Sequence, residues 1–224
     1  MEPTRRAFRS QISKQILDTL AASAVEYSEN GEAGTDLRDA PEYLLCVDLA
    51  RGLTSAFGTL RYHLEHRASS FEATAENVVD TSTAMGKALA RFDVVLLDRK
   101  SQRPRYVIEV KRGTRIVGDA RRLMRLAALE HGRPRWKHGF IVTIMRRTEE
   151  RIASVVENLK GSVLALNSDP EMGLPVGSSI AVQAEYRVVG QSNPAHSGTS
   201  VYAAVLRLSL TTSATSDPDE DALE

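Results

Sequence analysis

The spacing of apolar residues along the chain changes period, and the period separates predicted helices from predicted strands. Apolar residues recur at steps of three and four over residues 4–24, 41–57, 114–132 and 146–161. This spacing places them on one face of a helix, so four amphipathic helices are expected.

Shorter apolar or alternating runs predict the strands. The two clearest are RFDVVLLD and RYVIEVK, joined by a polar, proline-containing link that favours an antiparallel hairpin. The remaining runs follow: 58–67, 138–145, 178–190 and 199–210. The order strand, strand, helix, strand, helix predicts an α/β fold with a mixed central sheet flanked by helices.

Polar segments divide the chain between these elements. Residues 28–41 form a Gly- and Asp-rich loop, with Asp39 as the expected N-cap of the next helix and Pro41 in its first turn. Residues 68–90 form a long polar excursion. We expect an N-terminal helix and loop over 1–40 and a core over 41–165. A C-terminal β-hairpin over 166–210 extends the same domain, and a disordered acidic tail covers 211–224.

The formal charge is balanced, with 29 basic and 29 acidic residues, but its distribution is uneven. Residues 91–151 carry 14 Arg and 3 Lys against 7 acids, an excess of 10 positive charges. A polyanionic partner would match this segment, although a solvated Arg-rich surface would have the same composition.

The chain has no run of eighteen apolar residues and no secretory leader at its N-terminus, so a cytoplasmic location without membrane contact is expected. Cys46 is the single cysteine and lies in an apolar run. It is expected to be buried and inert, because one thiol can form neither an internal disulfide nor a thiolate cluster.

Ionisable residues interrupt the most apolar strands. If Asp98 pairs with Arg105, paired positions in the hairpin sum to 203, and Asp93 lies opposite Val110 with Glu109 and Lys111 on either side. Burying three such groups is costly unless each is paired or binds a metal. A hard-cation site would explain them, with Asp93, Glu109 and the carbonyl of Val110 as oxygen ligands for Mg2+, or for Mn2+ in its place.

Phosphodiester cleavage uses such a site, because a bound cation lowers the pKa of water and balances charge on the phosphate. Lys111 would orient the attacking water. The alternative is an edge strand whose Glu and Lys face solvent, since the E-x-K spacing is common there.

The run R91-F-D-V-V-L-L-D98, a short turn and Y106-V-I-E-V-K111 together resemble the PD-(D/E)XK nucleases, the restriction-endonuclease-like superfamily. The order of elements over 41 to about 145 is similar to the αβββαβ core of that superfamily. The resemblance implies that Asp93 and Glu109 bind metal and that Lys111 acts on the water. Glu42 is similar to the acidic residue that many members place on the preceding helix, although it would also suit the helix dipole. The chain departs from the literal signature at Phe92, where the family motif has proline.

Arginines follow the strand that carries Lys111, and Arg112, Arg115 and Arg122 are the candidates for phosphate contacts. Arg115 and Arg122 are expected to share a helix face. Some of the arginines in this segment, which also holds Arg121 and Arg125, would instead pair with Asp119 or Glu130 on the helix surface.

Several other signals carry less. Asp98 should lie at the far end of the hairpin, and Glu65 is expected to pair with Arg61 or Arg67, with a ligand role as the alternative. His63 and His66 should point apart in a strand, against a zinc site. Trp136, in a basic loop, would stack on a base or cover the core.

The residues and the resemblance together predict a Mg2+-dependent endonuclease acting on DNA, and the resemblance implies a role in host defence or DNA processing. Two alternatives stay open: a nucleic-acid-binding or assembly subunit that depends on a partner, and a nuclease acting on RNA. Cutting two strands would favour a homodimer, with the C-terminal hairpin as a contact surface.

Overall fold

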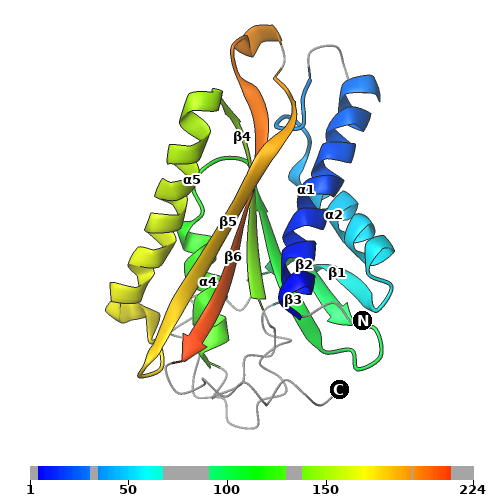
Figure 1. Cartoon of the computed structure of the whole chain (residues 1–224). Coiled ribbons are helices and arrows are strands. Elements are labelled where there is room, and N and C mark those ends of the chain that lie inside the picture. The colour runs from blue at the N-terminus through cyan, green and yellow to red at the C-terminus, as the bar shows by residue number, and fades with distance from the viewer. Residues whose placement is uncertain (1–4, 31–34, 68–90, 130–137, 193, 213–224) are drawn as a thin grey trace.

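The computed structural model describes residues 5–30, 35–67, 91–129, 138–192 and 194–212, with the side chains of 5–10, 67, 129, 194 and 212 left aside (Figure 1). Its centre is a six-stranded sheet in the order β1-β2-β3-β4-β6-β5. The strands are β1 Leu60–Arg67, β2 Arg91–Asp98, β3 Pro104–Lys111, β4 His138–Arg147, β5 Ser178–Gln191 and β6 Ser200–Thr212. The helices are α1 Arg5–Asn30, α2 Glu42–Ala56, α4 Val117–Leu129 and α5 Glu149–Leu164. Short 3-10 turns cover Ala165–Ser168, Pro170–Met172 and Pro194–His196.

The sheet is mixed, as expected. β3 and β4 are parallel and connected through α4, whereas the other neighbouring pairs are antiparallel. β6 pairs with β4 from Gly139 to Arg147, so the predicted C-terminal hairpin completes the central sheet. The sequence therefore predicted the α/β class and the mixed sheet correctly.

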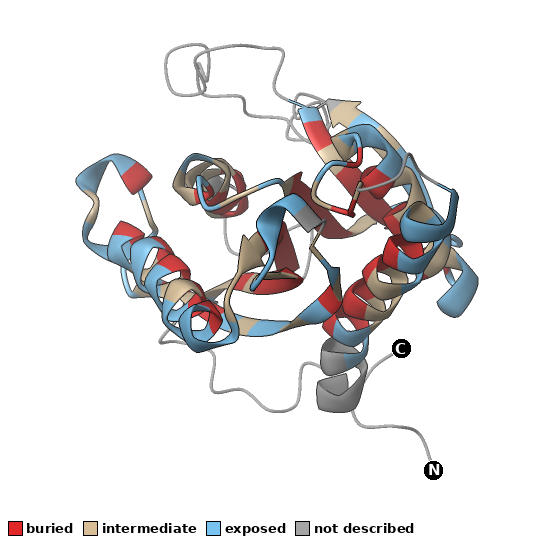
Figure 2. Ribbon diagram, turned by 90° about the horizontal axis from the view of Figure 1, so that it is seen from above, coloured by how far each residue is buried: buried red, intermediate tan, exposed pale blue. Residues whose placement is uncertain are grey.

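Helices cover both faces of this sheet, with α1 and α2 on one side and α4 and α5 on the other (Figure 1). Alternate residues of β4 serve the two faces: Phe140 and Val142 pack toward α1 and α2, and Ile141 and Met145 toward α4 and α5. Central strands of a doubly covered sheet are apolar on both faces, which is why β4 is a continuous apolar run. Figure 2 shows the buried residues gathered on the sheet and on the inward sides of the helices.

The register of the β2–β3 hairpin differs from the prediction by one residue. Val94 pairs with Ile108 and Leu96 with Tyr106, so paired positions sum to 202 rather than 203. A register shift between Leu96 and Leu97 separates these pairs from the turn, where the backbone N–H of Asp98 donates to the carbonyl of Arg103. A shift of one residue changes which residues of β3 lie beside each residue of β2.

Two local predictions were wrong. The rings of His63 and His66 lie 5.4 Å apart rather than on opposite faces of β1. Glu65 between them has a φ of 52°, which interrupts the alternation of side chains. Asp39 is not the N-cap of α2; Pro41 occupies that position and makes no side-chain cap.

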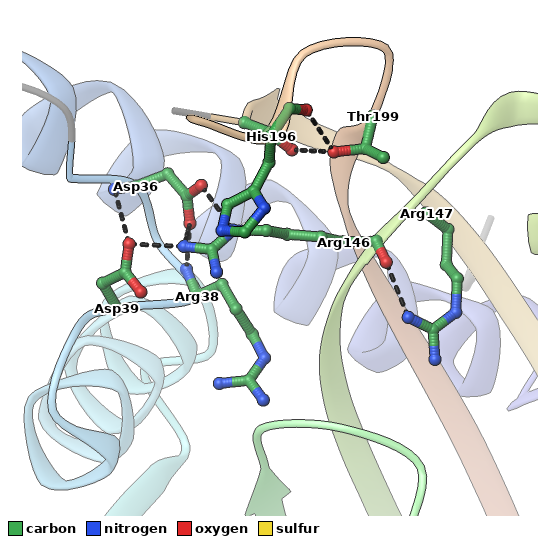
Figure 3. A network of polar contacts seen from close by, with 8 residues as sticks. Asp36, Arg38, Asp39, Arg146, Arg147, His196 and Thr199 are labelled. Carbon is green, nitrogen blue, oxygen red and sulfur yellow. Dashed lines mark hydrogen bonds and ion pairs between the residues drawn. The ribbon is translucent and has the colours of Figure 1, made fainter. Parts of the chain in front are cut away.

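Asp39 instead joins an ion cluster at the C-terminal end of β4 (Figure 3). The guanidinium of Arg146 donates to both carboxylate oxygens of Asp36, over 2.9 and 3.0 Å, and also to Asp39. Asp36 is only 6% exposed. We call Arg146, Asp36 and Asp39 the Arg146 clamp, because it fastens the segment before α2 to β4.

The disordered tail was predicted from residue 211, but β6 continues to Thr212, so its first two residues belong to a strand. Some predictions lie outside the described residues: the excursion over 68–90, the Trp136 loop, the partner role of Glu130, and the rest of the tail. Cys46 is buried on α2, as expected. In the part of the chain that the structure covers, no helix has both the length and the apolar character needed to cross a bilayer.

Candidate active site

The candidate site lies where β2 and β3 diverge. The recorded pairs of β2 and β3 end at Val94 and Ile108, and Asp93 and Glu109 are the next residue on each strand. Beyond this ladder, Asp93 Oδ2 accepts a hydrogen bond of 2.7 Å from the backbone N–H of Val110. The carboxylate of Asp93 therefore replaces a backbone partner at the end of β3.

Lys111 is the last residue of β3, and its ammonium lies among four carboxylates. Its Nζ is 3.6 Å from Glu109, 3.7 Å from Glu42, 3.8 Å from Asp93 and 4.0 Å from Asp119. Burial lowers the pKa of Lys111, but Asp93 and the other three carboxylates raise it more, so the pKa is above its usual value. Lys111 is therefore a permanent cation at the centre of an acidic cluster.

Glu109 is the most buried member, with its side chain 1% exposed. Burial and the nearby charge of Asp93 raise the pKa of Glu109 to about 8, against the lowering effects of Arg122 and Lys111. Its Oε1 accepts a hydrogen bond from Arg122, whereas Oε2 is buried with no hydrogen-bond partner. The ammonium of Lys111 lies 3.6 Å from this Oε2, beyond hydrogen-bond distance, so the oxygen keeps capacity for a further ligand.

Helix α4 supplies two more members through a single turn. Arg122 lies over the ring of Phe92, 5.3 Å from its centroid, and pairs with Asp119 at 3.3 Å as well as with Glu109. The predicted pairing of Asp119 with an arginine of its helix is confirmed, but its closeness to Lys111 was not foreseen. The interval of three residues predicts the contact between Asp119 and Arg122. Only the packing of α4 against β3 shows that both face the strand carboxylates.

Glu42 reaches Lys111 from the first turn of α2, on the other side of the strand end. Two arginine-to-carbonyl bonds hold the segment before α2 against the loop after β3. Arg38 donates to the carbonyl of Arg112 over 2.8 Å, and Arg112 donates to the carbonyl of Ala40 over 3.4 Å. The Arg146 clamp fastens the same segment to β4, so the position of Glu42 is fixed from two strands.

A pocket of about 450 Å³ opens beside Lys111. Its lining consists of Glu42, Lys111, Arg112, Gly113, Thr114 and Arg115. Arg115 lies in the loop before α4 rather than on its helix face, which corrects the prediction that it shares a face with Arg122. Arg115 is exposed and makes no ion pair with other described residues, so its guanidinium is available to a ligand of this pocket.

The residues fit a divalent cation in charge and donor type, although not in their present arrangement. Among the described residues, no three Asp, Glu, His or Cys side chains gather closely enough to hold an ion; the carboxylates surround Lys111 instead. If every group is ionised, four carboxylates against Lys111 and Arg122 leave two negative charges in excess. Glu109 Oε2, which pairs with Lys111 but accepts no hydrogen bond, and the carboxylate of Asp93 are hard donors of the kind Mg2+ prefers. Val110 N–H points to Asp93, and its carbonyl points to the same side of the strand.

Two residues weighed from the sequence take other roles. Asp98 lies at the turn of the hairpin, where Oδ1 accepts from the N–H groups of Lys100 and Ser101, and Oδ2 pairs with Arg105. These hydrogen bonds lower the pKa of Asp98 to about 2. Among the described side chains, Glu65 pairs with Arg91 at 3.9 Å rather than with Arg61, and the side chain of Arg67 lies outside them.

The sequence matches no protein-family model and no curated protein.

Proposed function

We propose that this protein is a metal-dependent nuclease that hydrolyses phosphodiester bonds in DNA, with the restriction-endonuclease-like arrangement that its motif resembles. One observation carries the proposal: Asp93, Glu109 and Lys111 converge at the diverging ends of two neighbouring strands, with an unbonded buried carboxylate oxygen among them. Charged groups held at this cost are a feature of catalytic sites.

Asp93, Glu109 and the carbonyl of Val110 would hold Mg2+, or Mn2+ in its place. The cation would supply a water of lowered pKa and positive charge beside the phosphate. Glu109 must lose its proton to bind, and Lys111 and Arg122 favour its charged form. Lys111, permanently charged, would orient the attacking water and balance charge on the phosphate oxygens.

The pocket beside Lys111 is the proposed place for the phosphate. Arg112 and Arg115 line it, and their guanidinium groups present several donors to phosphate oxygens. Arg122 has a different role from the one expected: it is occupied by Glu109 and Asp119, so it would hold the acidic cluster rather than contact the nucleic acid.

The test is incubation of the purified protein with plasmid, single-stranded DNA and RNA, in Mg2+, Mn2+ or EDTA. Metal-dependent cleavage by the wild type and not by Lys111→Ala is the expected result. Arg121→Ala is a matched control, because Arg121 pairs with Asp169 and Glu171 away from the cluster. Cleavage of RNA alone would show that RNA, not DNA, is the substrate. Equal cleavage by the wild type and all variants would show that the Lys111 cluster is not the active site.

A second function is favoured by the arrangement of Lys111. Its ammonium already lies between the carboxylates, as in a self-compensating ion cluster that binds no metal. Under this alternative the chain is a nucleic-acid-binding or assembly subunit that depends on a partner for activity. It predicts binding to nucleic acid that is unchanged by EDTA and by Glu109→Gln, with no turnover.

A further inference from the structure

Strand β5 forms one edge of the described sheet, and its outward backbone groups identify an interaction surface. The amide side chain of Asn167 bonds both polar groups of Ile180: its Oδ1 accepts from the N–H over 2.6 Å, and its Nδ2 donates to the carbonyl over 3.1 Å. The N–H and C=O of Ile180 therefore point away from β6. By the alternation of an antiparallel ladder, those of Val182, Ala184 and Tyr186 do so as well.

Within the described ranges, no hydrogen bond reaches the outward groups of Val182, Ala184 or Tyr186. Helices α1 and α5 lie on opposite faces of β5 and leave its edge open between them (Figure 1). Proteins commonly protect such an edge with charged side chains, proline or a bulge. This strand has no lysine or proline; it carries Glu185 and Arg187, and its bulge lies beyond Val188. The edge is therefore suited to receive another strand.

The side chains along the edge indicate which strand it receives. Glu185 and Arg187 flank Tyr186, so a two-fold axis at Tyr186 would place Glu185 of each copy opposite Arg187 of the other. An axis at Glu185 would instead place two glutamates opposite each other, which is unfavourable. Residue 186 has outward backbone groups, as pairing through hydrogen bonds across that axis requires.

We propose that β5 pairs antiparallel with β5 of a second copy of this chain, about a two-fold axis at Tyr186, and joins the six described strands of each copy into one sheet across a homodimer. Two hydrogen-bonded backbone stretches and two Glu185–Arg187 contacts hold the dimer. Arg187 is also 2.8 Å from Asp18 of its own α1, and its five donors allow both contacts. This inference is independent of the proposed nuclease activity.

Charge exchange tests the register. Glu185→Arg places arginine opposite arginine, and Arg187→Glu places glutamate opposite glutamate, so each variant alone should be mainly monomeric. Their mixture restores opposite charges at both positions and should form a heterodimer. Light scattering during gel filtration measures the mass, expected at twice 24.6 kDa for the wild type and for the mixture. Failure of the mixture to associate would overturn the charge pairing.

Cysteine cross-linking gives a second, independent test. Tyr186→Cys should form a disulfide between copies under mild oxidation, because residues across a hydrogen-bonded pair lie about 5.5 Å apart at Cα. Glu185→Cys is the matched control and should not cross-link with itself efficiently. The reverse result would move the axis to Glu185. A monomeric wild type with neither cross-link would overturn the proposal.

A proline on the edge tests the backbone contact without removing charge. Ala184→Pro deletes an outward N–H that makes no bond within the described chain, so the monomer should fold. Circular dichroism checks the fold, and the dimer should be lost. A dimer that persists in this variant would show that the contact lies elsewhere.

Discussion

Two ion clusters lie at the ends of the neighbouring parallel strands β3 and β4, and they differ in how completely their buried charges are hydrogen-bonded. In the Arg146 clamp, arginine donates to both oxygens of Asp36, and hydrogen bonds from Arg146 and Asp36 lower the pKa of Asp39 despite burial. In the Lys111 cluster, four carboxylates share two cations, and burial raises the pKa of Glu109 to about 8. The first is satisfied in every charge that it buries, whereas the second keeps an unbonded oxygen.

The difference separates a structural ion pair from a candidate reactive site. An ion pair whose buried groups are all hydrogen-bonded offers no group to a further ligand, so its role is to position the chain. An acidic cluster with excess negative charge becomes more favourable when it meets a cation. Changes in the first should therefore affect folding, and changes in the second should affect chemistry.

The largest expected effect is on catalysis by the Lys111 cluster. Asp93→Ala, Glu109→Ala and Lys111→Ala should each reduce cleavage by about 10²–10⁴-fold, because each removes a metal ligand or the group that acts on water. Initial rates on plasmid DNA in Mg2+ measure the effect, with thermal unfolding as the control for folding. Equal loss in Arg146→Ala without unfolding would remove the distinction between the two clusters.

The next effect is on stability at the Arg146 clamp. Arg146→Ala leaves Asp36 buried without its bidentate partner and should lower the free energy of unfolding by about 3 kcal/mol. Urea unfolding measures this value. Asp36→Ala combined with Arg146→Ala should cost less than the sum of the single changes, since the uncompensated charge is then absent. Simple additivity would contradict the proposed clamp.

A smaller effect is on the pH dependence of stability without metal. The pKa of Glu109 rises from 4.5 in the unfolded chain to about 8 in the folded one, so between these values only the folded state keeps the proton. The contribution of Glu109 to stability is therefore present below pH 4.5 and is lost as pH rises toward 8. In EDTA, the wild type should lose stability relative to Glu109→Gln between pH 5 and pH 8, as urea unfolding would show. Parallel pH profiles for the two proteins would contradict the raised pKa.

The smallest effect is on substrate affinity at the pocket. Arg115→Ala should weaken DNA binding by about 1 kcal/mol and reduce its dependence on salt by about one ionic contact, while the rate at saturating DNA changes little. Fluorescence anisotropy over a range of salt concentrations measures both. Arg125→Ala, on α4, serves as the matched loss of charge. An unchanged salt dependence in Arg115→Ala would place the phosphate elsewhere.

The sequence predicted the α/β class and the strands. It also singled out four residues that the structure brings together in the candidate site: Glu42, Asp93, Glu109 and Lys111. Period-two and helical patterns are strong in the core, and the E-x-K triplet stands out because it interrupts an apolar strand. The register of the hairpin was wrong by one residue. The shift between Leu96 and Leu97 depends on how the turn is closed by Asp98, and this is not visible in residue spacing.

Long-range pairing explains the other differences. Asp is a residue type favoured at N-caps, yet Asp39 is bound by Arg146, which is more than 100 residues away in the sequence. Arginine is a residue type that often binds phosphate, yet the packing of α4 directs Arg122 toward Glu109. His63 and His66 approach each other because one residue between them has a positive φ. Each outcome depends on a tertiary contact or a backbone conformation that local spacing does not encode.

The amide of Asn167 has a consequence for how far β5 can associate. It presents one N–H and its oxygen to the carbonyl and N–H of Ile180, as a residue of a neighbouring strand would. At the opposite end, the bulge between Val188 and Gly190 breaks the ladder. The outward backbone groups of β5 that can pair with another strand therefore lie between Ile180 and the bulge. Pairing with one second copy would use these groups, so no further copies could add along this edge to form a fibril.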